Sequence, residues 1–279
     1  MTTFKDHFSG HAADYAKFRP NYPPELFDYL ASISPGRELA WDCATGNGQA
    51  AVGLAEHFAK VTATDASAQQ IESAQPHPSI SYRIAPAEAS GIDPDSVDLI
   101  LVAQALHRFD MNRFFTEAKR VSKESGILAV STYTHVSINP EIDAILSKFY
   151  HETTAPYWPP ERELVETNFE SIRFPFPELS PHQFKMRQQW NLAQLTGYLR
   201  TWSATKKFIA ARGFDPVDSL MPGLGNVWHN REHVCQVTWP VKLRTFRVQS
   251  GAGAGAGAGK TIHTEKERGG PFDPPLPCL

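Results

Sequence analysis

Apolar and polar positions follow two different periods between residues 23 and 134. Short apolar and β-branched runs predict strands at 38–44, 60–65, 80–86, 97–104 and 127–134. Before and between them, apolar residues recur at helical spacing, which predicts helices at 23–33, 48–58, 67–74 and 112–122. Because strands that alternate with helices build βαβ units, this part of the chain predicts an α/β fold around a parallel sheet.

The pattern changes after residue 135, where proline and aromatic residues become frequent. A helical stretch is expected at about 191–212, and residues 235–248 are expected to form a final pair of strands. We expect this region to form an elaboration beside the sheet. Four of its aromatic residues are candidates for the wall of a binding site, although core packing also explains each one: Tyr157, Trp158, Trp190 and Trp202.

Residues 250–279 differ again in composition, with a Gly-Ala repeat followed by a polar and Pro-rich sequence. Such a segment has too little apolar surface to offset the entropy cost of ordering. We predict that it is disordered and that removing it leaves folding intact.

Composition narrows the class of protein. With 279 residues and 41% hydrophobic residues the chain can bury a large core, and its net charge of -3 gives no general attraction for nucleic acid or anionic membranes. The three cysteines are far apart and the histidines are scattered, so neither a disulfide framework nor a metal site is predicted. The longest apolar run, 97–106, is too short and too polar to cross a membrane. We expect a cytoplasmic protein.

The stretch WDCATGNGQAA, residues 41–51, runs from a predicted strand into a predicted helix and contains an aspartate and two glycines. Gly46, Gly48 and Ala51 fit the G-x-G-x-x-A pattern of a dinucleotide-binding turn. Asp42 lies four residues before the first glycine, however, and its charge disfavours a pyrophosphate there. A tight turn also needs glycine when no ligand binds. The glycines alone therefore leave a dinucleotide site, another ligand site and a plain turn open.

Polar residues follow three other predicted strands. Asp65 ends the second strand, where an open α/β sheet presents a carboxylate to ribose hydroxyls, although an acid that starts a helix would occupy the same place. Ala87 and Glu88 follow the third strand, and Gln104 and His107 lie at the carboxyl end of the fourth. Because the carboxyl ends of parallel strands share one edge, we expect these residues to surround one ligand.

Together these motifs resemble those of the class I S-adenosylmethionine-dependent methyltransferases, over most of residues 8–249. DCATGNG is similar to the family's first motif, D-x-G-x-G-x-G, with Ala44 in place of its first glycine, and TATDAS is similar to its ribose motif. VDLILVAQALHRF resembles its fourth-strand motif, and FFTEAKRVSKESGILAV resembles the helix, turn and fifth strand that follow.

A narrower resemblance is to a branch that includes trans-aconitate and other small-acid carboxyl methyltransferases. It rests on FSGHAADYAKFRPNYP, AQALHRFD, YLRTWSA and VTWPVKLRTFRV. The chain departs from that branch at Arg108, where the branch usually has Trp, and at 124–126, where Glu-Ser-Gly replaces its usual Pro-Gly-Gly.

The resemblance implies a Rossmann-like, seven-stranded, mostly parallel sheet with helices on both faces and a C-terminal elaboration. It divides the chain into an N-terminal lid and helix at 1–35 and a cofactor-binding core at 36–135. A substrate-side elaboration with the final strands would occupy 136–249, followed by the tail at 250–279.

The cofactor implied by the resemblance is S-adenosylmethionine, without a metal. The residues expected to bind it are Tyr15, Arg19, Asp42, Ala44, Gly46, Gly48, Asp65, Ala66, Ala87, Glu88 and Gln104. In that family the glycine loop brackets the methionine part, and Asp65 would hold the ribose while Ala87 and Glu88 flank adenine. Arg19 is a candidate for the cofactor carboxylate, with a surface charge as the alternative.

Methyl transfer from a sulfonium is an in-line displacement, so positioning of the acceptor is the main requirement. A carboxylate acceptor needs no proton removed, whereas a hydroxyl or amine would use a base such as His107, which could equally be structural. We expect O-methylation of a small, anionic organic molecule, with a carboxylate favoured, by a monomer or weak homodimer that binds neither nucleic acid nor membranes. An NAD-dependent oxidoreductase and a non-catalytic S-adenosylmethionine-binding protein are the alternatives.

Overall fold

The computed structural model describes residues 18–228 and 230–249. Tyr15 and the predicted tail at 250–279 therefore lie outside the described residues. No helix within the described part of the chain has both the length and the apolar character needed to cross a bilayer.

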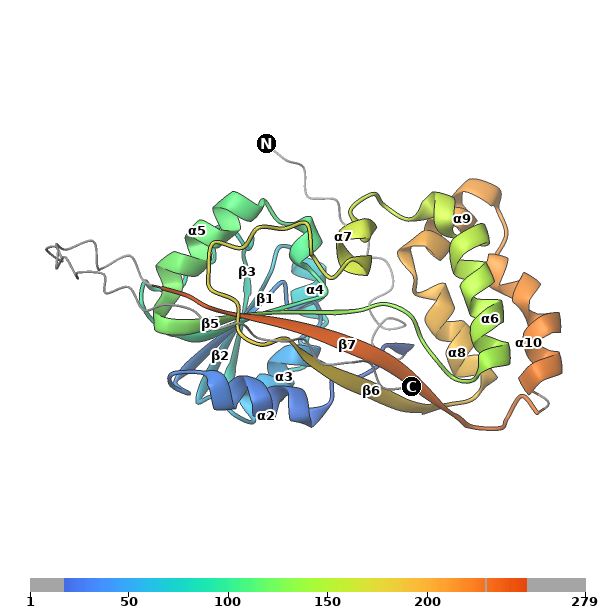
Figure 1. Ribbon diagram of the computed structural model, residues 1–279, viewed down its shortest axis with the longest axis horizontal. Helices are drawn as coiled ribbons and strands as arrows, with labels where there is room; N and C mark the ends of the chain where they lie inside the picture. Colours follow the sequence, from blue (N-terminus) through green and yellow to red (C-terminus); the bar gives the residue numbers. More distant parts are fainter. Residues whose placement is uncertain (1–17, 229, 250–279) are drawn as a thin grey trace, which may run out of the picture.

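Seven strands form one sheet in the order β3-β2-β1-β4-β5-β7-β6 (Figure 1). Their bounds are β1 (Leu39–Cys43), β2 (Lys60–Asp65), β3 (Ile80–Ile84), β4 (Val97–Ala103), β5 (Ser122–Tyr133), β6 (His182–Trp190) and β7 (Cys235–Arg247). The first five strands, β1 to β5, all pair in parallel. The β7 strand runs antiparallel to its neighbours β5 and β6. The predicted seven-stranded, mostly parallel α/β fold is confirmed. It places β1 in the interior of the sheet, between β2 and β4.

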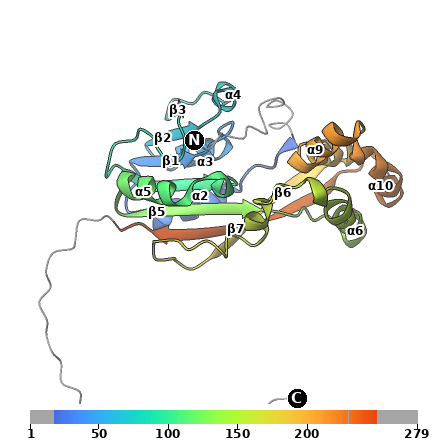
Figure 2. The same ribbon diagram turned by 90° about the horizontal axis from the view of Figure 1, so that it is seen from above.

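Helices cover both faces of the sheet. Those of the first half are α2 (Pro24–Ile33), α3 (Gln49–Ala55), α4 (Ala68–Glu72) and α5 (Met111–Val121), each within a few residues of its predicted range. Figures 1 and 2 show α2 and α3 on one face and α5 on the other. The α5 helix begins at Asp110, which accepts a hydrogen bond from the Arg113 N–H and so caps it. Its buried side includes Phe114 and Ala118, as the spacing predicted.

The elaboration is helical and lies beside the sheet end where β5 stops (Figure 1). It contains α6 (Pro140–Lys148), α7 (Arg162–Glu166), α8 (Leu192–Arg200), α9 (Ser203–Arg212) and α10 (Met221–Trp228). The helical stretch predicted at about 191–212 is confirmed and consists of two helices, because Trp202 adopts an extended conformation between them and the Thr201 hydroxyl bonds back to the Tyr198 carbonyl at 2.6 Å. The break turns the Trp202 side chain into the interior, where it is 6% exposed.

The predicted final pair of strands at 235–248 is wrong. This segment is one continuous strand, β7, and its partner is β6, which comes from the region described above only as rich in proline and aromatic residues. In β7 alternate residues bond to opposite neighbours: the Thr238 N–H bonds to Ser137 on the β5 side, and the Arg247 N–H bonds to Pro177 on the β6 side.

Pro240 is tolerated within β7 for the same reason. By this alternation its missing N–H faces the β5 side, and β5 has already ended opposite Val241. A proline in the middle of a strand run therefore did not mark a turn.

Candidate active site

The loop between β1 and α3 brings its backbone to the carboxyl edge of the sheet. Ala44, Gly46 and Gly48 all adopt positive φ angles, of 58°, 58° and 87°. A Cβ atom on Gly48 would lie 2.5 Å from the Tyr82 hydroxyl oxygen, so a larger residue would have to displace Tyr82 as well as adopt a strained positive φ. The result is a narrow turn that leaves backbone groups open to a ligand at its tip.

Ala44 is the strained member of this loop, because an L-residue at positive φ costs about 1–2 kcal/mol. We expect Ala44→Gly to stabilise the protein by about 0.5–1 kcal/mol after the added backbone entropy is subtracted, measured by urea unfolding. Gly48→Ala is the matched comparison and should destabilise. Equal effects of the two changes would contradict this account of the loop.

Asp42 lies directly beneath the loop and has no exposed surface. Its Oδ2 accepts a hydrogen bond from the Thr45 hydroxyl, whereas its buried Oδ1 has no hydrogen-bond partner among the described residues. Burial raises the pKa of Asp42 to about 7, and the bond from Thr45 opposes part of that rise. An unpartnered buried carboxylate oxygen fits a cationic ligand group such as an ammonium.

Asp65 at the end of β2 connects two loops. Its Oδ2 accepts the Gly46 N–H and its Oδ1 accepts the Ser67 N–H, both at 2.9 Å. Ser67, rather than Asp65, is the N-cap of α4, which weighs against the helix-start interpretation. A carboxylate has about four acceptor positions, so two remain for ribose hydroxyls. Ala66, which lies between Asp65 and Ser67 in the chain, is half-buried.

Gln104 and Arg19 both bond to Tyr133, the last residue of β5. The Gln104 amide nitrogen donates to the Tyr133 carbonyl at 2.7 Å, and Gln104 itself has a φ of 58°. Arg19 Nη1 donates to the Tyr133 hydroxyl at 3.2 Å, and its guanidinium carbon lies 5.3 Å from the centre of the Tyr198 ring. Arg19 is therefore half-buried at this edge, which weighs against the surface-charge interpretation.

Ala87 and Glu88 follow β3 in the direction of α5. Ala87 is 7% exposed and belongs to the apolar cluster on the α5 side of the sheet. The Glu88 Oε1 accepts the Asp110 N–H at 2.9 Å, so this carboxylate links the loop after β3 to the start of α5.

His107 lies in a short 3-10 turn directly after β4. Its Nδ1 is buried and has no hydrogen-bond partner among the described residues. Burial lowers the pKa of His107 to about 3, and the charges of Arg108 and Arg162 add to the effect. The imidazole is therefore neutral at physiological pH.

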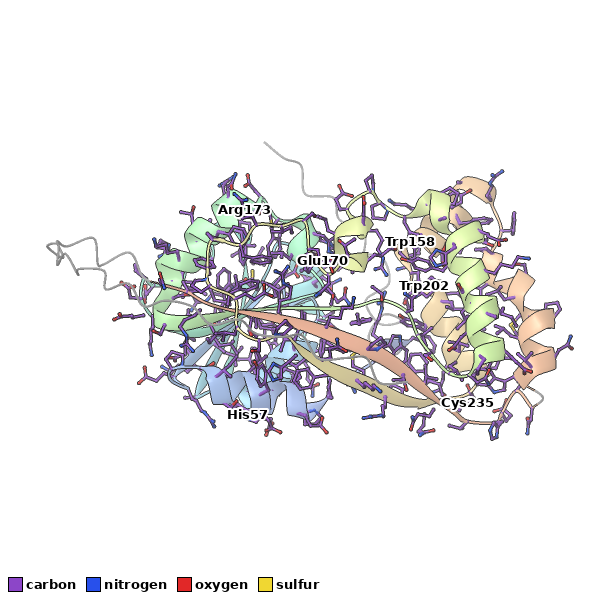
Figure 3. All side chains as sticks on the ribbon, in the orientation of Figure 1. His57, Trp158, Glu170, Arg173, Trp202 and Cys235 are labelled. Carbon is purple, nitrogen blue, oxygen red and sulfur yellow. The ribbon has the colours of Figure 1, made fainter. Side chains whose placement is uncertain are left out.

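The four aromatic candidates lie in different parts of the structure. Trp158 and Trp202 lie together, with ring centres 5.7 Å apart, on the side of the elaboration near α7 (Figure 3). Trp190 packs in the core against Trp239 at 4.8 Å, and Tyr157 packs against Phe208 of α9 at 5.0 Å. Only the first pair remains a candidate for a binding site.

A cluster of polar side chains beside Trp158 and Trp202 was not predicted from the sequence. Arg162 Nε donates to the Tyr150 hydroxyl at 2.9 Å, and the same hydroxyl donates to Glu166. His135, which follows β5, contacts the Tyr150 ring edge-on at 4.7 Å. These residues are far apart along the chain and form no motif, so only the packing of α7 against the sheet edge reveals them.

The arrangement divides into a side with carboxylates and a glycine loop, and a side with arginines, histidines and aromatic rings. The first side can hold a ligand with hydroxyl and ammonium groups, and the second can hold an anion. Among the described residues no group of three or more His, Cys, Asp or Glu side chains could hold a metal ion.

Comparisons with known proteins agree on one family. A family model described as a methyltransferase domain matches residues 41–130. A solved structure from Anaeromyxobacter dehalogenans, named as a type II methyltransferase, is 41% identical with a TM-score of 0.80 and covers 84% of this chain and 99% of that one.

Curated relatives carry similar names. A Dictyostelium discoideum protein named as a methyltransferase is 35% identical over 78% of this chain and 85% of its own length. A Saccharomyces cerevisiae protein named as an S-adenosylmethionine-dependent methyltransferase is 28% identical over 47% of this chain and 46% of its own length.

Proposed function

Because the chain belongs to the class I S-adenosylmethionine-dependent methyltransferases, with S-adenosylmethionine as its cofactor, we propose that it methylates an oxygen atom of a small, anionic organic acceptor, a carboxylate being favoured. The resemblance to the branch of small-acid carboxyl methyltransferases supports this choice of acceptor. The observation that carries it is the neutral, weakly basic His107 beside Arg162 at the acceptor side.

Two features of the chain fit the cofactor. The positive-φ loop from Ala44 to Gly48 can bracket the methionine part, and the unpartnered Oδ1 of Asp42 can accept from its ammonium. Asp65 has acceptor positions left for the ribose. When bound, the cofactor supplies a methyl group on a sulfonium, and the electrons of the broken C–S bond return to sulfur as the new O–C bond forms.

The chain's part in the reaction is then to align the acceptor and exclude water. A base with a pKa of about 3 takes up a proton poorly near neutral pH, so His107 is poorly suited to activate a phenol or an ammonium acceptor. A carboxylate is already ionised and needs no base, which is why this acceptor fits the site better.

The test is a methyl-transfer screen with labelled S-adenosylmethionine against small carboxylic acids, phenols and amines. We expect methyl esters of one or more carboxylic acids and no transfer to the other two classes. Product from phenols or amines alone would contradict the carboxylate acceptor. Cofactor binding without transfer to any acceptor would instead favour a non-catalytic binding protein.

His107→Ala provides a second test on whichever acceptor the screen identifies. With a carboxylate we expect turnover to fall less than about tenfold and the rate to show no titration of this residue between pH 6 and pH 9. A loss of about 100-fold or more, with unchanged cofactor affinity, would make His107 the catalytic base. His57→Ala is the control, since His57 follows the end of α3 and lies beside Asp28 of α2, away from the site (Figure 3).

A further inference from the structure

A cluster of aromatic and charged side chains lies between α7 and the helices of the elaboration. It consists of Tyr150, Trp158, Arg162, Glu166 and Trp202, which we call the α7 cluster. The Tyr150 ring lies 5.1 Å from that of Trp158 and 5.7 Å from that of Trp202. Figure 3 shows Trp158 and Trp202 near each other in this region. The rings form a rigid setting for the one arginine of the cluster.

Arg162 is held in place by one end of its guanidinium group. Its central carbon lies 4.8 Å from the centre of the Trp158 ring and 5.8 Å from that of Tyr150, and its Nε donates to the Tyr150 hydroxyl. Neither terminal nitrogen donates a hydrogen bond to any described residue. The side chain is 20% exposed, so solvent reaches it. The planar pair of terminal nitrogens is the geometry that binds a carboxylate with two parallel bonds.

Glu166 does not occupy that position. Its Oε1 accepts from the Tyr150 hydroxyl and lies 3.6 Å from Arg162 Nε, on the side of the guanidinium that is already bonded. The terminal nitrogens thus keep unused donors.

Two more polar atoms of this region are buried without a partner among the described residues: Trp158 Nε1 and His107 Nδ1. Trp158 Nε1–H can only donate, and it belongs to the ring beneath Arg162. An unsatisfied buried donor costs about 1–3 kcal/mol, which an acceptor oxygen would recover. The unused donors of Arg162 and Trp158 therefore favour a ligand that carries oxygen acceptors.

A cationic acceptor fits these rings poorly. The Tyr150 and Trp158 faces already hold Arg162, and the nearby Tyr198 face holds Arg19. A second cation would meet like charge at each of these faces.

From these contacts we propose that Arg162 and Trp158 form an acceptor subsite that binds a carboxylate group of the methyl acceptor and so determines its specificity. The proposal deepens the function proposed above and rests on it. The bound carboxylate is distinct from the atom that is methylated, because a bidentate bond to arginine would tie up the lone pairs that must attack the methyl group.

The test follows the Trp158 indole N–H signal by nuclear magnetic resonance in the full chain saturated with S-adenosylhomocysteine, with succinate as the probe. Trp158→Phe assigns the signal. We expect succinate to shift it saturably in the wild-type protein, and Arg162→Gln to weaken succinate binding at least tenfold. Arg162→Lys keeps the positive charge but loses the planar guanidinium. We expect its affinity for succinate to lie between those of the wild type and Arg162→Gln.

The matched control is Arg173→Gln, which removes an arginine away from the α7 cluster (Figure 3) and should leave succinate binding unchanged. Calorimetry with S-adenosylhomocysteine checks that each variant folds and keeps its cofactor site. The proposal is overturned if succinate never shifts the Trp158 signal, if Arg162→Gln behaves like the control, or if methyl phosphate binds more tightly than succinate.

Different results would contradict the proposed carboxylate acceptor and the proposed Arg162 subsite. If succinate binds through Arg162 but no carboxylic acid is ever methylated, the subsite stands and the carboxylate acceptor does not. If carboxylic acids are methylated with an unchanged KM in Arg162→Gln, the function stands and the subsite is overturned.

Discussion

Asp65→Ala should weaken the binding of S-adenosylmethionine by about 2–4 kcal/mol, roughly 30-fold to 1,000-fold, through the loss of two charge-assisted hydrogen bonds to a ribose. The same change removes the acceptor for the Gly46 and Ser67 N–H groups, which loosens the glycine loop. Calorimetry with S-adenosylhomocysteine measures the loss directly.

Asp65→Asn separates the two contributions, because its amide oxygen still accepts one of these N–H groups but its charge is gone. Asp93→Ala is a control in the loop before β4. A dissociation constant that stays at the wild-type value in Asp65→Ala would leave Asp65 as a residue that only connects the two loops.

The second large effect is a pH dependence of stability caused by Asp42. Its pKa is 3.8 in a free chain and about 7 in the fold. Below pH 3.8 the group is protonated in both states; as the pH rises toward 7, the unfolded chain ionises while the folded one keeps its proton. The unfolded state gains from this, so native stability falls by up to about 4 kcal/mol between pH 4 and pH 8.

Asp42→Asn removes this titration. We therefore expect the unfolding free energy of the variant, relative to wild type, to rise between pH 4 and pH 8 in urea unfolding. The constant cost of an amide at this buried position cancels in the comparison between the two pH values. The exposed Asp28→Asn on α2 should show no such change. Parallel pH curves for Asp42→Asn and wild type would mean that Asp42 is ionised in the fold without penalty.

Binding of the cofactor should offset this loss of stability at high pH, since an ammonium paired with Asp42 Oδ1 favours the ionised carboxylate. The thermal stabilisation given by S-adenosylmethionine should thus be larger at pH 8 than at pH 6 in wild type, and this difference should vanish in Asp42→Asn.

Local pattern was enough to predict the cofactor half of the fold. The β2 strand begins at Lys60 and ends at Asp65 as predicted, because its β-branched and small residues are typical of a buried strand and a charged residue marks each end. The same reasoning placed the glycine loop after β1, where the positive φ of Gly48 and the closeness of Tyr82 disfavour any side chain. In these cases the residues that determine the structure are neighbours in the chain.

The region after residue 135 was not predictable in that way. The β6 strand is an edge strand whose outward positions are polar, so it lacks an apolar run, and the Pro240 position in β7 is harmless only because β5 ends beside it. The break of the predicted helix at Trp202 likewise follows from what its ring packs against, Phe149 and Tyr198, rather than from a helix-breaking residue.

The sequence by itself therefore determined the five parallel strands, the glycine loop and the candidates Asp42, Asp65 and His107, because each candidate lies near the end of a strand that the pattern marks. The tertiary structure alone decided the environment of those groups. The low pKa of His107 depends on burial and on Arg162, 55 positions further along the chain, and the unused donors of Arg162 and Trp158 exist only where α7 packs. Burial and charge act through space, and a local pattern records neither.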